Sequence, residues 1–534
     1  MLRITNFSVP FDDESPLKDI VAKRLKLPPE AVLEVVVVRK AIDARRYRNS
    51  PIQFVYMLNV TVAMPEKKVL AKLRNDKNVA MLSNNSQEPL VYGETLLKAR
   101  PVIIGLGPAG LLAAWTLAKH GYKPLVLERG RDVDRRTADI QKFWQSGSLD
   151  EQSNVQFGEG GAGTFSDGKL TTRINDSKMT DVLDLFISAG APPEIKYLHK
   201  PHIGTDKLRN VVKNIRNQII RFGGEVRFEA TVTNIDSKDG VVQGVMVNET
   251  EYISCGVVML GIGHSARDTY AMLHKNQIAM EAKAFAVGVR IEHPQEWMDK
   301  AQYTVDAGHK RLPVSDYALT YQDKETGRGA YSFCMCPGGQ VVAATSEKGQ
   351  VVTNGMSNYH RNSGIANSAL LVTVGPDDFD CADVLAGITF QRKYEALAFT
   401  CAGSNYYAPV QTVGDFLSKK KGSSDFITKP TYLPGVTAVD LRECLPDFIT
   451  NTLAHALPYF GQKIKGFDHP GVLMTGVETR SSAPCRIIRT REFVSLNTEG
   501  LYPIGEGAGY AGGIMSAAID GLNGAIAVMK KYKA

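Results

Sequence analysis

The feature that most constrains this chain of 534 residues is a glycine-rich turn between an apolar strand and a helix. Residues 101–105 are predicted to form a buried strand, Gly105-Leu106-Gly107-Pro108-Ala109-Gly110 a tight turn, and residues 111–120 a helix. A second apolar strand at 124–127 leads to Glu128, eighteen residues after Gly110. This order predicts a βαβ unit of the kind that binds a dinucleotide.

Each residue of the turn has a defined task in such a unit. Gly105 makes the tight turn, Gly107 lets backbone amides reach a pyrophosphate at the helix N-terminus, and Gly110 permits close packing of the helix on the strand. Glu128 is expected to accept hydrogen bonds from the adenosine ribose, and its charge disfavours the 2′-phosphate of NADP. FAD and NAD both fit this pattern, and a glycine-rich turn without a ligand is the alternative.

The C-terminal segment 501–521 favours FAD. A strand, the turn Gly505-Glu506-Gly507 and a helix that begins near Gly513 follow one another. This segment resembles the strand, acidic turn and terminal helix of the glutathione-reductase-like flavoproteins, with Glu506 in place of the usual Asp. The resemblance implies that Glu506 binds the ribityl-phosphate region and that the helix directs its N-terminal amides at flavin N1 and the C2 carbonyl. A packing helix of small residues is the alternative.

Two further glycine runs bear on the cofactor. The run 158–163 matches the GxGxxG spacing, but no helical pattern follows it, so we expect a loop whose Thr164, Ser166 and Lys169 line the flavin or its pyrophosphate. The run 261–266 follows a strand and precedes a helix. We interpret it as the turn that closes a β-meander, with a hairpin at 239–240, rather than as a second dinucleotide site for NAD(P)H.

Together these motifs resemble the bacterial FAD-dependent dehydrogenases, also called NAD(FAD)-utilising dehydrogenases. The resemblance covers essentially the whole chain, and it implies bound FAD and an α/β flavoprotein fold without naming a substrate. The segments that carry it are 39–46, 158–170, 263–268, 288–294, 335–339, 367–372, 479–484 and 505–521.

The expected fold is α/β, with a Rossmann-like FAD-binding domain of glutathione-reductase type. That domain is predicted to combine residues 96–280 with 498–534. Residues 281–497 lack a βα rhythm and are expected to form an inserted α+β substrate domain. Residues 1–95 read as β, α, β, β, α, which favours a separate ferredoxin-like α+β domain.

The site residues follow from these motifs. Those expected to hold FAD are Gly105, Gly107, Pro108, Ala109, Gly110, Glu128, Arg129, Gly163, Thr164, Val232, Gly263, Gly505, Glu506, Gly513 and Ile514. The candidates for contact with substrate, each with a structural role as its alternative, are His264, His293, Cys336, His455 and Arg480. They are candidates because they lie in or beside the unusual segments.

Cysteine usage excludes several other sites. The seven cysteines form an odd set without a CxxC pair, which excludes a zinc knuckle and a thioredoxin-type motif and favours a reducing compartment such as the cytoplasm. A redox dithiol at Cys334-Met335-Cys336 needs an unusual CxC geometry, so a buried thiol pair is expected there. No metal site, secretory signal or membrane span is predicted.

Charge is uneven along the chain. Residues 1–100 hold 17 Lys and Arg against 11 Asp and Glu, which accounts for nearly all of the net charge of +7. A solvated basic face is the expected explanation, and a contact with nucleic acid is the alternative.

Three functions are therefore weighed. The first is an FAD-dependent oxidoreductase that acts on a small organic substrate by hydride transfer through flavin N5, with NAD(P)H as a transient electron donor or acceptor. The second is a flavin-dependent RNA-modifying enzyme that grips the backbone through Arg39, Lys40, Arg45, Arg46 and Arg48. The third is a non-catalytic flavin redox sensor. The sequence leaves the substrate, the direction of electron flow and the oligomeric state open.

Overall fold

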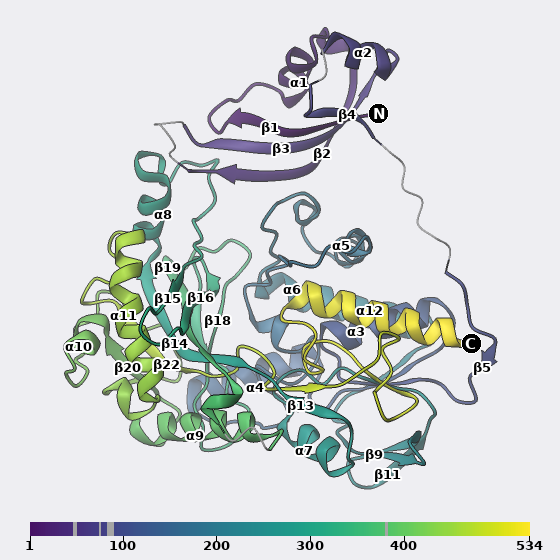
Figure 1. Cartoon of the computed structure of the whole chain (residues 1–534), viewed down its shortest axis with the longest axis vertical. Coiled ribbons are helices and arrows are strands. Elements are labelled where there is room, and N and C mark those ends of the chain that lie inside the picture. The colour runs from purple at the N-terminus through teal and green to yellow at the C-terminus, as the bar shows by residue number, and fades with distance from the viewer. Residues whose placement is uncertain (46–50, 74–75, 83–89, 380–382) are drawn as a thin grey trace.

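The computed structural model describes residues 1–45, 51–73, 76–82, 90–379 and 383–534. The first part of the chain forms an antiparallel sheet in the order β2-β3-β1-β4, drawn in purple in Figure 1. Its elements are β1 (Leu2–Pro10), α1 (Leu17–Leu25), β2 (Val32–Asp43), β3 (Gln53–Val62), α2 (Glu66–Lys72) and β4 (Val79–Met81). Every second residue of β3 is buried, because alternate side chains of a strand face the same side. This β-α-β-β-α-β order contains the predicted β, α, β, β, α sequence and adds β4.

Five short parallel strands form the centre of the molecule, in the order β24-β12-β6-β7-β8. They are β6 (Val102–Ile104), β7 (Leu125–Leu127), β8 (Glu225–Arg227), β12 (Val258–Leu260) and β24 (Leu501–Pro503). All three residues of β6, β7, β12 and β24 are buried, as expected for a parallel sheet that is covered on both faces.

Helices cover one face of this sheet and a second, smaller sheet covers the other. Ile103 and Val126 pack with α3 (Pro108–Lys119), α6 (Thr205–Arg221) and α12 (Ile514–Lys531). On the opposite face, Ile104 and Leu127 pack against the meander β9 (Val232–Lys238), β10 (Val241–Val247) and β11 (Glu251–Ser254), with α7 (Arg267–Lys275) beside it. The predicted hairpin is present, and its turn residues Asp239 and Gly240 both have positive φ.

The residues between strands β12 and β24 form a seven-stranded sheet. Its order is β15-β16-β19-β14-β22-β20-β21, and the pairing is antiparallel except between β20 and β21. The strands are β14 (Phe285–Pro294), β15 (Thr320–Gln322), β16 (Gly329–Cys336), β19 (Ile365–Val374), β20 (Ala408–Thr412), β21 (Val436–Ala438) and β22 (Leu473–Glu478). The helices α9 (Ala386–Cys401) and α11 (Asp447–Lys463) pack on it.

Shorter elements connect these parts. They are β5 (Thr95–Leu96), α4 (Val133–Ser146), α5 (Met179–Ser188), β13 (Met280–Ala282), α8 (Gln295–Tyr303), β17 (Gln340–Ala343), β18 (Thr353–Met356), α10 (Val413–Leu417), β23 (Cys485–Ile487) and β25 (Tyr532–Lys533). Within the described ranges, no helix combines the length and the apolar character needed to cross a bilayer. The mixed α/β fold with a Rossmann-like unit is as predicted, whereas the domain boundaries at 95, 280 and 497 stay predictions.

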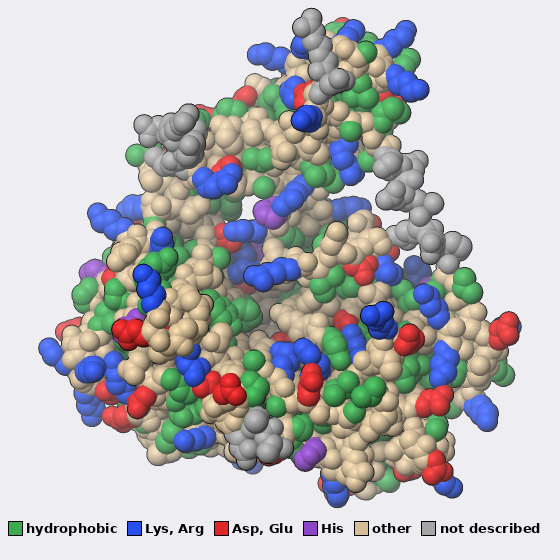
Figure 2. Space-filling model, in the orientation of Figure 1, with side chains coloured by type: hydrophobic (Ala, Val, Ile, Leu, Met, Phe, Trp, Pro, Cys, Tyr) green, Lys and Arg blue, Asp and Glu red, His purple; other side chains and the backbone are tan. Residues whose placement is uncertain are grey.

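The N-terminal sheet reaches the rest of the molecule through the edge strand β2. The Lys40 amide donates to the Tyr197 carbonyl oxygen at 2.7 Å, and the His199 amide donates to the Lys40 carbonyl oxygen at 2.9 Å. Figure 2 shows a hollow between the N-terminal sheet and the body, with Lys, Arg and His side chains around it.

Candidate cofactor-binding site

A cavity of about 350 Å³ lies where the carboxyl ends of the parallel strands meet the seven-stranded sheet. Ile104, Leu127 and Ile504 line it from the ends of three strands. Residues 261–266, which follow β12, line it as well. Ligands of open parallel sheets bind at this edge, and the volume lies in the range of small-molecule sites.

Two helix N-termini face this cavity. Helix α3 begins at Pro108 after Gly107, helix α12 begins at Ile514 after Gly513, and all four residues line the cavity. Neither helix has a side-chain cap or an acidic residue in its first turn. Their first amides are therefore free of side-chain acceptors, which makes both termini suitable for an anion or a carbonyl oxygen.

Close packing brings these two helices together. A Cβ atom at Gly521 of α12 would lie 2.0 Å from the Ala109 carbonyl oxygen of α3, so only glycine allows this approach. The turn before α3 is equally constrained, because Gly105 has a φ of +90° and its Cβ would lie 2.4 Å from the Gly261 carbonyl oxygen. Gly110 packs against this turn and does not line the cavity.

Glu128 holds three loops of the cavity in place. Its Oε1 accepts from the amides of Gly130 at 2.9 Å and Gly158 at 3.0 Å, and its Oε2 accepts from the Leu106 amide at 2.8 Å. A carboxylate oxygen has two acceptor directions, so Oε2 keeps one for a ligand hydroxyl. The side chain of the next residue, Arg129, lies over the Phe157 ring and forms an ion pair with Asp268 at 3.0 Å.

The glycine run after residue 157 forms the predicted loop, with a single 3₁₀ turn at Ala162–Phe165. Gly163, Ser166 and Lys169 line the cavity, whereas Thr164 does not. The Thr164 side chain turns inward, since a Cβ at Gly160 would lie 2.0 Å from its hydroxyl oxygen. Thr164 is therefore buried beside the cavity, and its contact with FAD stays a prediction.

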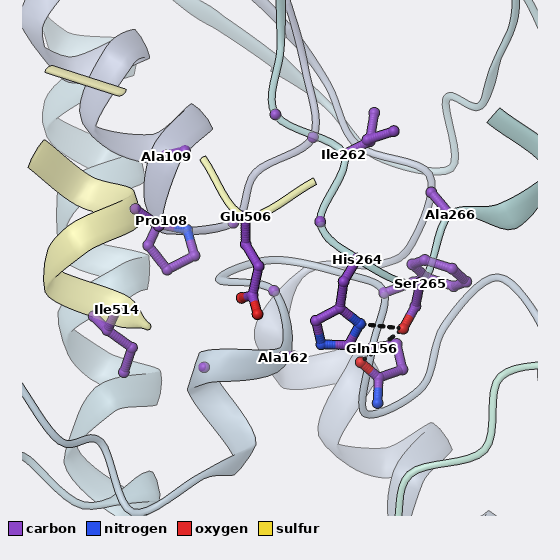
Figure 3. A pocket seen from close by; sticks show the side chains of 18 of the residues that line it. Pro108, Ala109, Gln156, Ala162, Ile262, His264, Ser265, Ala266, Glu506 and Ile514 are labelled. Carbon is purple, nitrogen blue, oxygen red and sulfur yellow. Dashed lines mark hydrogen bonds between the residues drawn. The ribbon is translucent and has the colours of Figure 1, made fainter. Parts of the chain in front are cut away.

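Glu506 extends into the space between Pro108 and His264 (Figure 3). Among the described residues, none forms a hydrogen bond or ion pair with its carboxyl group. Burial raises the pKa of Glu506 to about 7, and the positive charge of Lys283 lowers it only in part. A carboxyl group in this state can donate as well as accept a hydrogen bond near neutral pH. Gly505, which is also predicted to hold FAD, does not line the cavity. Its amide donates to Asp520 Oδ2 at 2.6 Å.

The opposite wall is built from buried ion pairs. Arg480 lines the cavity, and its Nη2 lies 2.9 Å from Glu395 Oε2. Glu395 is fully buried and also pairs with Arg267 at 2.7 Å. The two arginines hold the pKa of Glu395 well below its usual value despite the burial. The partly exposed Glu347 pairs with Arg267 at 2.6 Å as well, so two carboxylates balance the two guanidinium groups.

His264 lies beside this network. Its Nδ1 lies 2.8 Å from Ser265 Oγ, and the Ser265 hydroxyl donates to Gln156 Oε1 at 3.2 Å (Figure 3). Burial and the nearby Arg480 and Arg267 lower the pKa of His264 to about 3. The imidazole is therefore neutral at physiological pH.

A second buried pair lies deeper, on the seven-stranded sheet. Arg290 forms a two-point contact with Glu478, with Nε to Oε2 at 2.7 Å and Nη2 to Oε1 at 2.8 Å. The Arg290 Nη1 also donates to the Cys334 carbonyl oxygen at 2.9 Å. Cys334, Asn354 and Glu478 line the cavity, so this pair supports its floor.

Three candidates lie away from the cavity. His293 is buried and its Nε2 lies 2.8 Å from the Phe467 carbonyl oxygen. His455 is half-exposed on α11, where its Nδ1 lies 2.8 Å from Asp323 Oδ2. Cys336 is fully buried, but Cys334 is not, so the predicted buried thiol pair is correct for only one of the two thiols.

The predicted cofactor and substrate residues fall into two groups, according to whether they line the cavity. Those that line the cavity are Gly105, Gly107, Pro108, Ala109, Glu128, Arg129, Gly163, Val232, Gly263, His264, Arg480, Glu506, Gly513 and Ile514. Those that do not are Gly110, Thr164, His293, Cys336, His455 and Gly505. Sequence reasoning missed Arg267, Glu395 and Glu478, because their partners are 85 to 188 residues away along the chain.

The basic N-terminal residues are engaged within the chain. Arg39 Nη2 lies 2.7 Å from His199 Nδ1, Lys40 lies over the Phe54 ring, and Arg45 pairs with Asp43 at 2.7 Å. Arg46 and Arg48 lie outside the described residues. Binding of nucleic acid by this face stays a prediction. In the part of the chain that the structure describes, no cluster of His, Cys, Asp and Glu is suited to a metal ion.

The fold defines a Rossmann-like protein with a cavity at the carboxyl edge of its parallel sheet. Comparison with family models agrees: residues 284–481 match "FAD-dependent protein, C-terminal domain-like", residues 103–143 match an NAD(P)-binding Rossmann-like domain, and residues 1–61 match a domain of unknown function. An uncharacterised protein of Clostridium beijerinckii is 48% identical over 532 residues, which are 99% of each chain. The chain belongs to the family of this relative and is an FAD-dependent protein.

Several solved structures resemble this fold, all with low TM-scores. CtdE in complex with FAD has a TM-score of 0.29 and 12% identity, over 79% of this chain and 82% of that chain. Glycine oxidase from Bacillus cereus has a TM-score of 0.31 and 9% identity, over 82% and 98%. L-proline dehydrogenase from P. horikoshii has a TM-score of 0.33 and 11% identity, over 81% and 93%. The finer assignment to the glutathione-reductase-like superfamily stays a prediction.

Proposed function

We propose that the cavity holds FAD and that the enzyme transfers a hydride between this cofactor and a small organic substrate. One observation carries the proposal: two helix N-termini without side-chain caps, about 400 residues apart in sequence, line a single cavity. The residues present fit FAD. Glycine turns leave the backbone bare at Gly107 and Gly163, and the carboxyl group of Glu506 has no protein partner among the described residues.

Each end of the cofactor has suitable groups. The amides at the start of α3 would hold the pyrophosphate, and the free acceptor direction of Glu128 Oε2 would take a ribose hydroxyl. The amides at the start of α12 and the Glu506 carboxyl group would face the flavin end. When bound, FAD supplies two-electron chemistry through its N5 atom.

The substrate would lie against the other wall. Phe333, Asn354 and Ser481 line the cavity from the side of the seven-stranded sheet and give it mixed apolar and hydrogen-bonding character. Arg480 keeps its charge there, balanced by Glu395, and the neutral His264 can accept or donate one hydrogen bond. Glu506, with its pKa raised to about 7, is the group best suited to hold or release a proton at the cavity.

NAD(P)H would share the same cavity. The run 261–266 directly follows strand β12 of the five-stranded parallel sheet and lines this same cavity, so it does not form a separate site for a second dinucleotide. Electron exchange with NAD(P)H would therefore require its nicotinamide to enter the substrate space for each turnover.

The test is to measure FAD binding by wild-type protein and by Gly107→Ala. The backbone of Gly107 is extended and its Cβ would meet only the Gly161 Cα at 3.8 Å, so the protein should fold while the methyl group blocks the approach of a ligand. We expect at least about a tenfold loss of FAD affinity, equivalent to ~1.4 kcal/mol. Gly256→Ala, whose added methyl meets no atom within 4 Å, should bind as wild type does. Folded wild-type protein that gains no visible chromophore with excess FAD would refute the proposal.

A further inference from the structure

Strand β16 is irregular where it reaches the cavity. Phe333 pairs with Ala369 and Cys336 pairs with Asn367, so β16 has one residue more than β19 between these two pairs. Cys334, inside this bulge, has a φ of +42°, in the left-handed region that non-glycine residues rarely adopt. Bulges of this kind redirect side chains, and strained backbone persists where the surrounding structure holds it.

The bulge brings two thiols together. In a regular strand, residues two apart have Cα atoms about 6.6 Å apart, close to the upper limit for a disulfide. Here the chain turns at Cys334, and the Cys336 thiol donates to the Cys334 carbonyl oxygen at 3.3 Å. The Cys336 sulfur is therefore turned back toward Cys334, and the interaction between the two thiols shifts the pKa of each.

The two thiols differ in access. Cys334 lines the cavity, whereas Cys336 is fully buried behind it. Interaction with the neighbouring Cys336 thiol lowers the pKa of Cys334 to about 5, and the charges of Arg290 and Lys169 act in the same direction against burial. The pKa of Cys336 lies well above its usual value. An accessible thiolate with a protonated thiol behind it is the arrangement of a reactive and a resolving cysteine.

We propose that Cys334 and Cys336 form a redox-active pair that cycles between dithiol and disulfide and exchanges two electrons with the FAD of this cavity. This inference rests on the proposed function, because FAD is the oxidant. The Cys334 thiolate and the Cys336 thiol form one S–S bond, and the single S–H bond of Cys336 is lost. Two electrons and that one proton pass to oxidised FAD, which becomes FADH⁻, so no further proton is released. A small thiol or disulfide that reaches Cys334 through the cavity is then the class of substrate.

The first experiment is an anaerobic reductive titration of the FAD-loaded protein after oxidation. Wild type should take up four electrons per FAD, two for the flavin and two for the disulfide, and Cys336→Ser should take up two. Cys401→Ser is the matched control, because Cys401 and Cys444 also interact but neither lines the cavity. It should keep the wild-type stoichiometry. Retained yellow colour reports that each variant is folded. Uptake of two electrons by wild type with FAD bound would overturn the proposal.

The second experiment needs no cofactor. The full chain without FAD is equilibrated with mixtures of reduced and oxidised dithiothreitol, alkylated and analysed by mass spectrometry. We expect Cys334 and Cys336 to lose alkylation together as the mixture becomes oxidising, and Cys334 to stay alkylated in Cys336→Ser. Alkylation of both thiols in the most oxidising mixture refutes the pair. If the pair oxidises but the protein binds no FAD, the proposed function fails and the electron exchange fails with it, so the two ideas are tested separately.

Discussion

The two walls of the cavity are built in different ways. One wall consists of backbone at glycine turns and helix starts, in residues 104–109, 158–163 and 504–514. The other wall depends on side chains, with Arg480 and Glu478 held by buried partners. The backbone wall can bind a cofactor whichever side chains surround it, whereas the charged wall is stable only while every partner is present. The first wall should therefore determine cofactor affinity and the second the stability of the fold.

Removal of Glu395 should have the largest effect on stability. In Glu395→Ala, the buried Arg267 and Arg480 lose their fully buried carboxylate and keep only the partly exposed Glu347, which is expected to lower the free energy of unfolding by ~3–5 kcal/mol. Urea denaturation followed by circular dichroism measures this loss. The control is Glu499→Ala, which breaks an exposed pair with Lys531 and should cost less than about 1 kcal/mol. Equal losses in the two variants would contradict the contrast between the walls.

Glu506 links the backbone wall to pH. Its folded-state pKa is raised to about 7, so the FAD-free protein loses stability as the pH rises toward and through that value. Glu506→Gln removes the ionisable group and should therefore be more stable than wild type by ~3 kcal/mol at about pH 8, with a small difference at about pH 5. Denaturation at the two pH values measures this difference. Glu499→Gln is the control, because Lys531 lowers the pKa of exposed Glu499 and its ionised form therefore stabilises the fold. If Glu499→Gln were also more stable than wild type at about pH 8, ionisation of Glu506 would not explain the gain.

The crossing of α3 and α12 should couple stability to cofactor affinity. In Gly521→Ala, the added methyl would lie 2.0 Å from the Ala109 carbonyl oxygen and must separate the helices whose N-termini face the cavity. We expect a loss of ~1–3 kcal/mol in the free energy of unfolding and weaker FAD binding. Calorimetric titration with FAD and urea denaturation measure both quantities. Gly375→Ala, where the added methyl meets no atom within 4 Å, should change neither.

The sequence predicts the backbone wall well because its signals are local. Gly105, Gly110 and Glu128 lie within 24 residues, and each has a conformational or hydrogen-bonding reason to be where it is. The terminal helix was predicted from a resemblance, and its crossing with α3 at Gly521 follows only from the structure.

The charged wall could not be predicted in this way. Arg267 meets Glu395 across 128 residues, and nothing in either segment names the other. The bulge at Cys334 depends on the register of two strands, which no single strand encodes. For the same reason the sequence suggests His293 and His455 as candidates for contact with substrate, although the fold places both away from the cavity.

Substitution of His455 should have the smallest effect on FAD affinity and on stability. It lies on α11 and contacts Asp323, and it belongs to neither wall of the cavity. In His455→Ala we expect FAD affinity within about twofold of wild type and a change in unfolding free energy below ~1 kcal/mol, because the His455 side chain is half-exposed to solvent. His264→Ala is the matched variant, since His264 lines the cavity and should weaken FAD binding. If His455→Ala weakened FAD binding as much as His264→Ala, affinity would depend on the whole seven-stranded sheet, and the backbone wall would no longer explain it alone.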